Sequence, residues 1–292
     1  MSKLVGYCEI AAHYFLKCMP ISWCSWLGGF LGRIIGPLHK EVNQRLQRNI
    51  QHLRPDLTQE QEIQKIINNY WSNYGRVMAE FSVLRRIWRS NRVKVYGIKN
   101  LEEAMSHKRP IILLFLHLAN WEVVGPKFLE TSRQKTIQIY QLIEDPIKLK
   151  IAQRVRKPYE KYLIPNSPNV AIKIHRKLKQ GYNLSLAVDE FIQDRLVIPS
   201  FGREINSTSN LTFAVRLAKL VNAILMPAYA VRTKGAHFNL HFEPPVMLNF
   251  ANFDAQKLHK TVRQLDKLID PIIRKHIDQW YYAIALELAP LI

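Results

Sequence analysis

Two side chains able to transfer protons stand close together where an apolar run ends. In the segment IILLFLHLANWE, residues 111–122, His117 follows six apolar residues and Glu122 comes five positions later. A carboxylate that holds one imidazole nitrogen leaves the other free to accept a proton near neutral pH. Such a pair can activate a hydroxyl for attack on an acyl carbon. The spacing alone also fits a solvent-facing histidine before an ordinary glutamate in the first turn of a helix.

The surrounding pattern predicts an α/β fold with a mostly parallel central sheet flanked by helices, because short apolar strands alternate with helical segments. The segment NRVKVYGIKNLEEA predicts a short alternating strand, a turn at Gly97 and a helix. The further predicted strands are 110–117, 136–142, 183–189, 223–231 and 238–246. Residues 40–89 predict helices, the first of which carries apolar residues on one face at Val42, Leu46, Ile50 and Leu53. The further predicted helices are about 121–132, 146–161, 168–179, 208–221 and 253–279. Ligands of such sheets bind at the carboxyl ends of the strands. His117 is therefore predicted at that edge.

The N-terminal segment, about residues 4–38, is rich in Leu, Ile, Phe and Trp. Glu9, Lys17, Pro20 and Arg33 interrupt it, so no apolar run reaches the roughly 20 residues that a spanning helix needs. Two short helices joined near Pro20 and lying in one membrane leaflet fit the pattern best. A single marginal transmembrane helix and a buried helical hairpin stay open as alternatives.

The charge balance points to a polyanionic partner. The 292 residues include 42 Lys and Arg against 23 Asp and Glu, a net charge of +19. Nucleic acid and an anionic membrane face both attract such a surface, but no helix-turn-helix, zinc-finger or RNA-binding signature is present. We expect a helical membrane-associating arm at residues 1–90 and an α/β domain at residues 91–292, with a basic nucleic-acid-binding protein as the alternative.

Several classes of site have no sequence signature here. The three cysteines, Cys8, Cys18 and Cys24, form no CxxC pair, and their odd number argues against a disulfide framework. They weakly suggest a reducing, cytoplasm-facing location. Walker, GxGxxG, GxSxG and HExxH motifs are missing. We expect chemistry without a metal or cofactor.

Three further residues are candidates for binding substrate. Asp189 ends a predicted strand at the same edge as His117, where it would position an acceptor, complete a polar network or cap the next loop. Arg203, in the loop segment SFGRE, and Arg232, at the end of another strand, would contact phosphate or acyl oxygens or remain solvated.

A basic segment precedes the predicted α/β domain. Arg85, Arg86, Arg89 and Arg92 surround Trp88. This pattern suits a membrane surface, with Trp88 at the interface, or a docking face for an acidic protein. A solvated helix end is the third possibility.

An ordered set of motifs resembles the lipid A late acyltransferases, the lauroyl and myristoyl transferases within the lysophospholipid acyltransferase superfamily. That family carries a histidine, four residues and an acid, matched here by HLANWE. Further resemblance lies in EVNQRLQRNIQHLRPDLTQEQ, RKLKQGYNLSLAVDE with Asp189 at its strand end, VIPSFGREINSTSNLTFAVRLAKLVNAILMPAYAVR, and the closing IDQWYYAI.

The resemblance implies acyl transfer from acyl carrier protein or acyl-coenzyme A to a hydroxyl of a membrane lipid, on the cytoplasmic face of the inner membrane. His117 would be the general base and Glu122 its orienting partner. Two residues depart from the family's pattern, Gln141 where an Arg is usual and Asn210 near a usual Gly. The anion contact expected at Gln141 would then be missing or moved to Lys148, Lys150 or Arg154. A membrane scaffold that lost activity is the other alternative.

Overall fold

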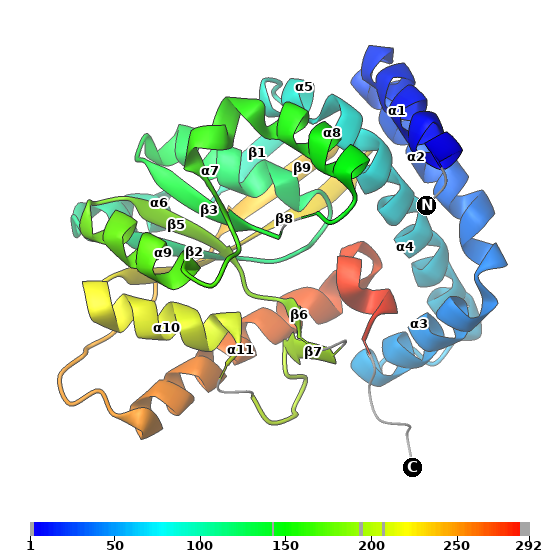
Figure 1. Cartoon of the computed structure of the whole chain (residues 1–292). Helices are drawn as coiled ribbons and strands as arrows, with labels where there is room; N and C mark the ends of the chain where they lie inside the picture. The colour runs from blue at the N-terminus through cyan, green and yellow to red at the C-terminus, as the bar shows by residue number, and fades with distance from the viewer. Residues whose placement is uncertain (1–2, 142, 193–194, 206–207, 287–292) are drawn as a thin grey trace.

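The central feature of the fold is a seven-stranded sheet (Figure 1). The computed structural model describes residues 3–141, 143–192, 195–205 and 208–286. The strand order is β1-β9-β8-β2-β5-β3-β4, and every neighbouring pair is parallel except β8 and β9. The strands are β1 (Val93–Tyr96), β2 (Ile111–Phe115), β3 (Thr136–Tyr140), β4 (Leu163–Pro165), β5 (Asn183–Ala187), β8 (Ile224–Lys234) and β9 (His237–Phe242). The predicted α/β class and the mostly parallel sheet are confirmed.

Strand β2 is buried on both faces, as its unbroken apolar sequence requires in the middle of a parallel sheet. Successive side chains of a strand point to opposite faces. Ile112 and Leu114 accordingly pack into one hydrophobic core, whereas Leu113 and Phe115 pack into the other. Its hydrogen-bonded neighbours are β8 and β5, so β2 delivers the residue after it to the centre of the sheet's carboxyl edge.

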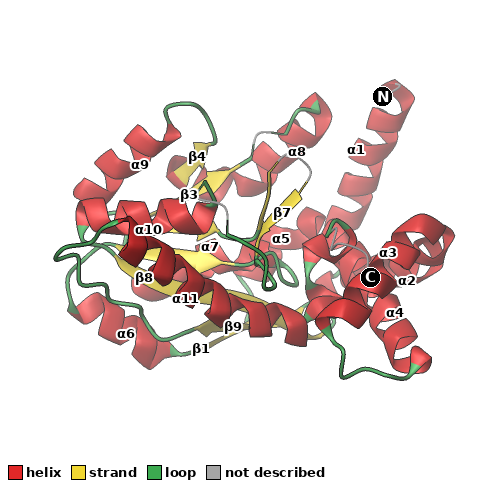
Figure 2. Ribbon diagram, turned by 90° about the horizontal axis from the view of Figure 1, so that it is seen from below, coloured by secondary structure: helices red, strands yellow, loops and turns green. Residues whose placement is uncertain are grey.

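Helices cover both faces of the sheet. The core on one side is built with α9 (Val170–Lys179), α10 (Asn210–Val221) and α11 (Ala255–Lys275), of which α10 and α11 lie across the strands in Figure 2. The core on the other side takes residues from α5 (Leu84–Trp88), α6 (Ile98–Ser106) and α7 (Val124–Ser132). Helix α8 (Pro146–Arg156) and the short turns η3 (Trp121–Val123) and η4 (Lys157–Tyr162) complete that side.

The chain before β1 is helical. It forms α1 (Lys3–Cys18), α2 (Ile21–Ile35), η1 (Gly36–Leu38), α3 (Lys40–Leu53), α4 (Glu60–Glu80) and η2 (Phe81–Val83). The predicted pair of short helices joined near Pro20 is confirmed as α1 and α2. No helix of the described residues is both long and apolar enough to cross a bilayer. Residues of α3 and α4 pack into the same hydrophobic core as the sheet.

Helix α2 lies against α4 through glycines that allow close backbone contact. A Cβ on Gly28 would lie 2.5 Å from the carbonyl oxygen of Gly75, and one on Gly32 would lie 2.1 Å from that of Trp71. Only glycine fits such an approach without displacing a backbone. The aromatic side chains of Trp23, Trp26 and Phe30 stay exposed on the same helix.

The predicted elements are present, with shifted ends. The strand predicted at 136–142 ends at Tyr140, and residue 142 lies outside the described part of the chain. The helix predicted at 121–132 starts as the turn η3, and that at 146–161 ends as η4. Three short strands were not predicted, β4 at the sheet edge and the antiparallel pair β6 (Glu190–Ile192) and β7 (Arg195–Ile198).

Candidate active site

The imidazole of His117 is held by Asp189. His117 follows β2 and Asp189 follows β5, two adjacent parallel strands, so both lie at the carboxyl edge of the sheet. The ring nitrogen Nδ1 is 2.9 Å from Asp189 Oδ1, and the backbone N–H of His117 donates to Asp189 Oδ2 over 2.8 Å. A carboxylate that accepts from Nδ1–H fixes the tautomer in which Nε2 is the proton acceptor.

The carboxylate of Asp189 has no exposed surface. A third donor, the indole N–H of Trp280, reaches Oδ2 over 2.9 Å. Three N–H groups therefore satisfy this buried carboxylate, as a charge out of contact with water requires. With its oxygens held from two directions, Asp189 can fix the plane of the imidazole.

The segment of residues 279–281 is joined by backbone hydrogen bonds to the loop that carries His117. The N–H of Tyr281 donates to the carbonyl of His117, and the N–H of Ala119 donates to the carbonyl of Gln279, each over 2.9 Å. Leu118 and Trp280 form an isolated antiparallel bridge between the two segments. Ala119 has φ of 47°, a conformation that costs energy for a residue with a side chain and persists where neighbours impose it.

Aromatic rings surround the imidazole. Trp121 and Tyr282 meet it edge to face, with ring centroids 5.0 and 5.1 Å away, and Phe115 lies at 5.9 Å. The side chain of His117 is 18% exposed, so the ring is reachable from solvent. Within the described residues, Nε2 has no hydrogen-bond partner. The ring therefore presents a proton acceptor to an open side.

Glu122 is not the partner of His117 in the structure. Its carboxylate forms an ion pair with Arg156 at the end of α8, through both guanidinium nitrogens Nε and Nη2. Burial works against the charge of Arg156, but the ion pair with Glu122 prevails and raises the guanidinium pKa above its usual value. The predicted Glu122–His117 hydrogen bond is wrong because Asp189 already occupies Nδ1, and Glu122 turns toward α8 instead.

Trp88 lies beside this ion pair rather than at an interface. It is 8% exposed, donates its indole N–H to the carbonyl of Glu122 over 2.9 Å and packs edge to face on Tyr159. The interpretation of Trp88 as a membrane-interface side chain is therefore wrong. Of the surrounding arginines, Arg86 and Arg92 bind the N-terminal arm, through the carbonyl of Lys17 and the hydroxyl of Ser22.

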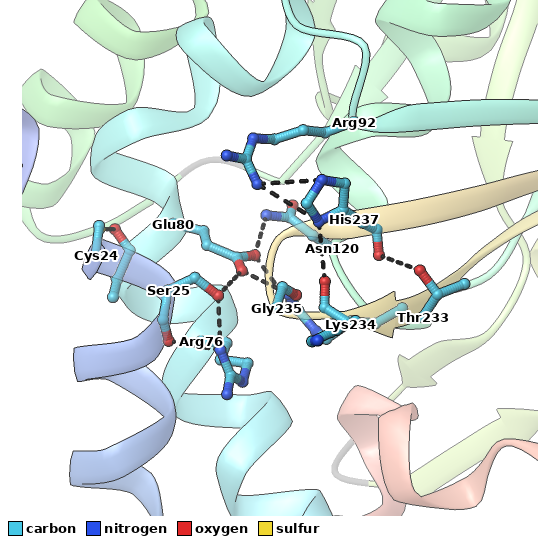
Figure 3. Close-up of polar contacts among 12 residues, drawn as sticks. Cys24, Ser25, Arg76, Glu80, Arg92, Asn120, Thr233, Lys234, Gly235 and His237 are labelled. Atoms are coloured by element: carbon cyan, nitrogen blue, oxygen red, sulfur yellow. Dashed lines mark hydrogen bonds and ion pairs between the residues drawn. The ribbon is translucent and has the colours of Figure 1, made fainter. Parts of the chain in front are cut away.

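Arg232 is part of a buried polar network. Its guanidinium, 5% exposed, pairs with both oxygens of Glu80, which has no exposed surface. Glu80 also accepts from Ser25 of α2 over 2.7 Å and from Asn120 over 2.9 Å. Figure 3 shows the Glu80 carboxylate between these two side chains. The ion pair with Glu80 joins α4 to β8, and Nε of Arg232 has no hydrogen-bond partner among the described residues. The contact of Arg232 with substrate stays a prediction.

Arg203 is likewise turned toward the protein. Its Nε and Nη2 donate to the carbonyls of Ser200 and Pro199 over 2.8 and 3.1 Å. Burial lowers the pKa of this guanidinium, and the nearby Asp266 partly offsets the effect. These contacts tie Arg203 to its own loop.

The side chains brought together can perform one kind of chemistry. His117 and Asp189 form a general base with an orienting carboxylate. In the described residues, no three His, Cys, Asp or Glu side chains gather in a way that could hold a metal ion. Asp189 lies at the predicted edge of the sheet, but its pairing with His117, the ion pair of Arg156 and the hydrogen bond of Trp280 have no signal in the sequence pattern.

Comparison with known proteins identifies the family of the chain. A search of curated proteins finds no match to the chain. The family model of the bacterial lipid A biosynthesis acyltransferases matches residues 2–284, which include the helical arm, the sheet and the segment of Trp280. A match over nearly the whole chain shows that the protein belongs to the bacterial lipid A biosynthesis acyltransferase family and is an acyltransferase.

Proposed function

We propose that the protein is a membrane-associated O-acyltransferase with His117 as general base. It moves a fatty acyl chain from the thioester of acyl carrier protein, or of acyl-coenzyme A, to a hydroxyl of a lipid A-type or other phosphate-bearing membrane lipid. The observation that carries this proposal is the hydrogen bond of His117 Nδ1 to the buried Asp189, which leaves Nε2 as the acceptor on the open side of the ring.

The reaction follows from that arrangement. The acceptor hydroxyl donates a hydrogen bond to Nε2 of His117, which takes the proton as the oxygen attacks the thioester carbonyl. The negative charge of the tetrahedral intermediate needs donors, which backbone N–H groups or the guanidinium of Arg156 would supply. Collapse breaks the C–S bond, and the proton on His117 passes to the departing thiolate. Asp189 stabilises the transient imidazolium throughout.

Attachment to the membrane is assigned to the N-terminal helices. Helix α2 packs on α4 by its glycines and leaves Trp23, Trp26, Phe30 and Ile34 between 46% and 66% exposed. Exposed aromatic side chains on one side of a helix suit insertion at headgroup depth. We place the enzyme on the cytoplasmic face of the inner membrane, the location that the family resemblance implies.

A basic face next to the site suits an acidic donor protein. Arg85 and Arg89 are exposed on and just after α5, whose Trp88 contacts Glu122. Complementary charge accelerates encounter between proteins. Acyl carrier protein is the donor that such a surface favours over the smaller coenzyme A.

Transfer from labelled acyl donors to a panel of membrane lipids tests this function. The wild-type protein and His117→Ala are compared with acyl carrier protein and coenzyme A thioesters, and the folding of the variant is verified by thermal melting. We expect transfer by the wild type and a loss of about 10²–10⁴-fold in the variant. An active His117→Ala protein would refute the base. Absence of both transfer and thioester hydrolysis in the wild type would favour an inactive scaffold.

A further inference from the structure

A groove between α1 and α8 has the composition of a lipid headgroup site. Its volume is about 480 Å³. The lining residues are Ile10, His13, Tyr14, Pro146, Ile147, Lys150, Ile151 and Arg154. The lining contains two cationic side chains and no acidic one, together with an apolar floor of isoleucines.

The pattern of α8 builds one wall of the groove. Pro146, Lys150 and Arg154 are spaced four residues apart and are exposed, with Ile147 and Ile151 beside them and less exposed. Residues four apart lie on the same side of a helix. Charged tips therefore stand along the rim while the isoleucines form the floor.

Helix α1 builds the other wall and is fixed close to α8. A Cβ on Gly6 would lie 2.1 Å from Cδ1 of Ile147, so glycine permits this approach. The hydroxyl of Tyr14 accepts a hydrogen bond from Arg154, and the ammonium of Lys17 lies 5.5 Å from the centre of the Tyr14 ring. Two cations, Lys150 and Arg154, thus line the groove, and a third, Lys17, lies over the Tyr14 ring.

Two acidic groups lie on or beside the helices that form the groove. Glu9 pairs through Oε1 with Lys148 over 3.3 Å, whereas its Oε2 is buried without a hydrogen-bond partner among the described residues. Asp145 accepts the backbone N–H groups of Ile147 and Lys148 as the cap of α8. Lys150 has no ion-pair partner among the described residues. Burial lowers the pKa of His13, and the positive charges of Lys17 and Arg154 lower it further, which shows the sign of the local field. The lining of the groove is therefore positive above an apolar floor.

We propose that this groove binds the phosphate of an anionic membrane phospholipid, with Lys150 and Arg154 as its ligands and the isoleucine floor against the start of an acyl chain. The neighbouring side chains Tyr14 and Phe15 are 42% and 63% exposed, so the groove opens beside the apolar surface of the arm. The inference rests on the membrane attachment described above. The groove would add recognition of a phosphate headgroup to the apolar contact that α2 makes with the membrane.

The test measures vesicle binding by the full chain. Wild type and the double variant Lys150→Gln/Arg154→Gln are sedimented with two kinds of phosphatidylcholine vesicle. One carries the phosphate lipid phosphatidylglycerol, and the other carries the carboxylate lipid cholesteryl hemisuccinate at a matched surface potential. The control Lys173→Gln/Lys179→Gln removes the same charge from α9, which lies at the other end of the molecule from α1 and α2 (Figure 1). Lys150→Gln alone serves if the double variant fails to fold.

We expect the groove variant to bind phosphatidylglycerol vesicles about tenfold more weakly, with a much smaller loss on the carboxylate lipid and in the control. Equal losses in the control, or on both lipids, would overturn the proposal, because general charge attraction would then explain binding. Release of the protein from the vesicles by soluble glycerol 3-phosphate would mean that the groove binds a soluble phosphate. That result would overturn the assignment of a membrane lipid as its occupant. A variant with Trp26→Ser and Phe30→Ser separates the two ideas. If this variant binds vesicles as the wild type does, the proposal that α2 attaches the protein to the membrane is refuted. If only the groove variant binds as the wild type does, the proposal of a headgroup site in the groove is refuted.

Discussion

The contact between His117 and Asp189 combines an accessible ring with an inaccessible carboxylate. Because Asp189 is fully buried and accepts three N–H groups, it has little freedom to turn away. Within the described part of the chain, the imidazole is hydrogen-bonded at Nδ1 only, and its Nε2 is on the open side of the ring. Reorganisation during the reaction is then small, which is the condition under which a fixed dipole contributes most to catalysis.

Glu122 has a separate task in this arrangement. We predict that Glu122→Gln lowers kcat by about 10²-fold, because the guanidinium of Arg156 loses the ion pair that places it. The pH at which the rate falls on the acid side should not move, since Nδ1 of His117 is bound to Asp189. Rates measured across pH for the variant and the wild type test this. A displaced acid limb would show that Glu122 acts directly on His117.

The sequence could locate His117 but not choose its acid. Glu122 is five residues from His117, whereas Asp189 is 72 residues away and reaches it only because β2 and β5 are neighbours in the sheet. Strand order is a tertiary property that no local spacing reveals. The ion pair of Arg232 could not be predicted either, because its partner Glu80 lies on α4, 152 positions earlier.

At the scale of elements, Glu80 at the end of α4 connects α2 with the loop that follows His117. It joins Ser25 of α2, Asn120 of the loop and Arg232 of β8 within one buried cluster. Arg76 adds a hydrogen bond to the hydroxyl of Ser25 over 2.9 Å. A shift of α2 would therefore disturb the segment between His117 and Glu122.

We predict that Glu80→Gln lowers the free energy of unfolding by about 3–5 kcal/mol, because it leaves the guanidinium of Arg232 buried without a countercharge. Glu102→Gln, a matched change at an exposed position of α6, should cost less than about 0.5 kcal/mol. Urea unfolding followed by circular dichroism compares the two. Equal free energies of unfolding for the two variants would mean that the ion pair of Glu80 does not stabilise the fold.

Elements with strong periodicity were predictable, and weakly patterned ones were not. The run 111–115 could only be a buried strand, and the helix Lys40–Leu53 follows its apolar spacing. The strand β4 has three residues, and β6 and β7 are short and irregular, so none of them shows a measurable alternation. They depend on neighbours that the sequence does not place.

The stability of the whole molecule should depend on the protonation of Asp278. Burial raises the pKa of this carboxyl from 3.8 to about 6. Between these values the folded state binds more protons than the unfolded chain, so stability falls as pH rises through this window. The carboxylate lies just before Gln279 and Trp280, in the segment that clamps the loop of His117.

We predict that Asp278→Asn raises the free energy of unfolding by up to about 3 kcal/mol at pH 8 and by little at pH 4. The wild type at pH 4 is its own reference, because the carboxyl is then protonated in the folded state. Thermal melts at both pH values measure the difference. A gain that is the same at both would exclude the carboxylate as its cause.

The most direct test of the account is the rate of acyl transfer by Asp189→Asn. The amide of asparagine can donate to Nδ1, which favours the tautomer with the proton on Nε2 and removes the base. We predict a fall in kcat of about 10²–10⁴-fold, with KM for the acyl donor nearly unchanged and the fold intact. A variant that transfers acyl chains at close to the wild-type rate would contradict the assignment of Asp189 as the partner of His117.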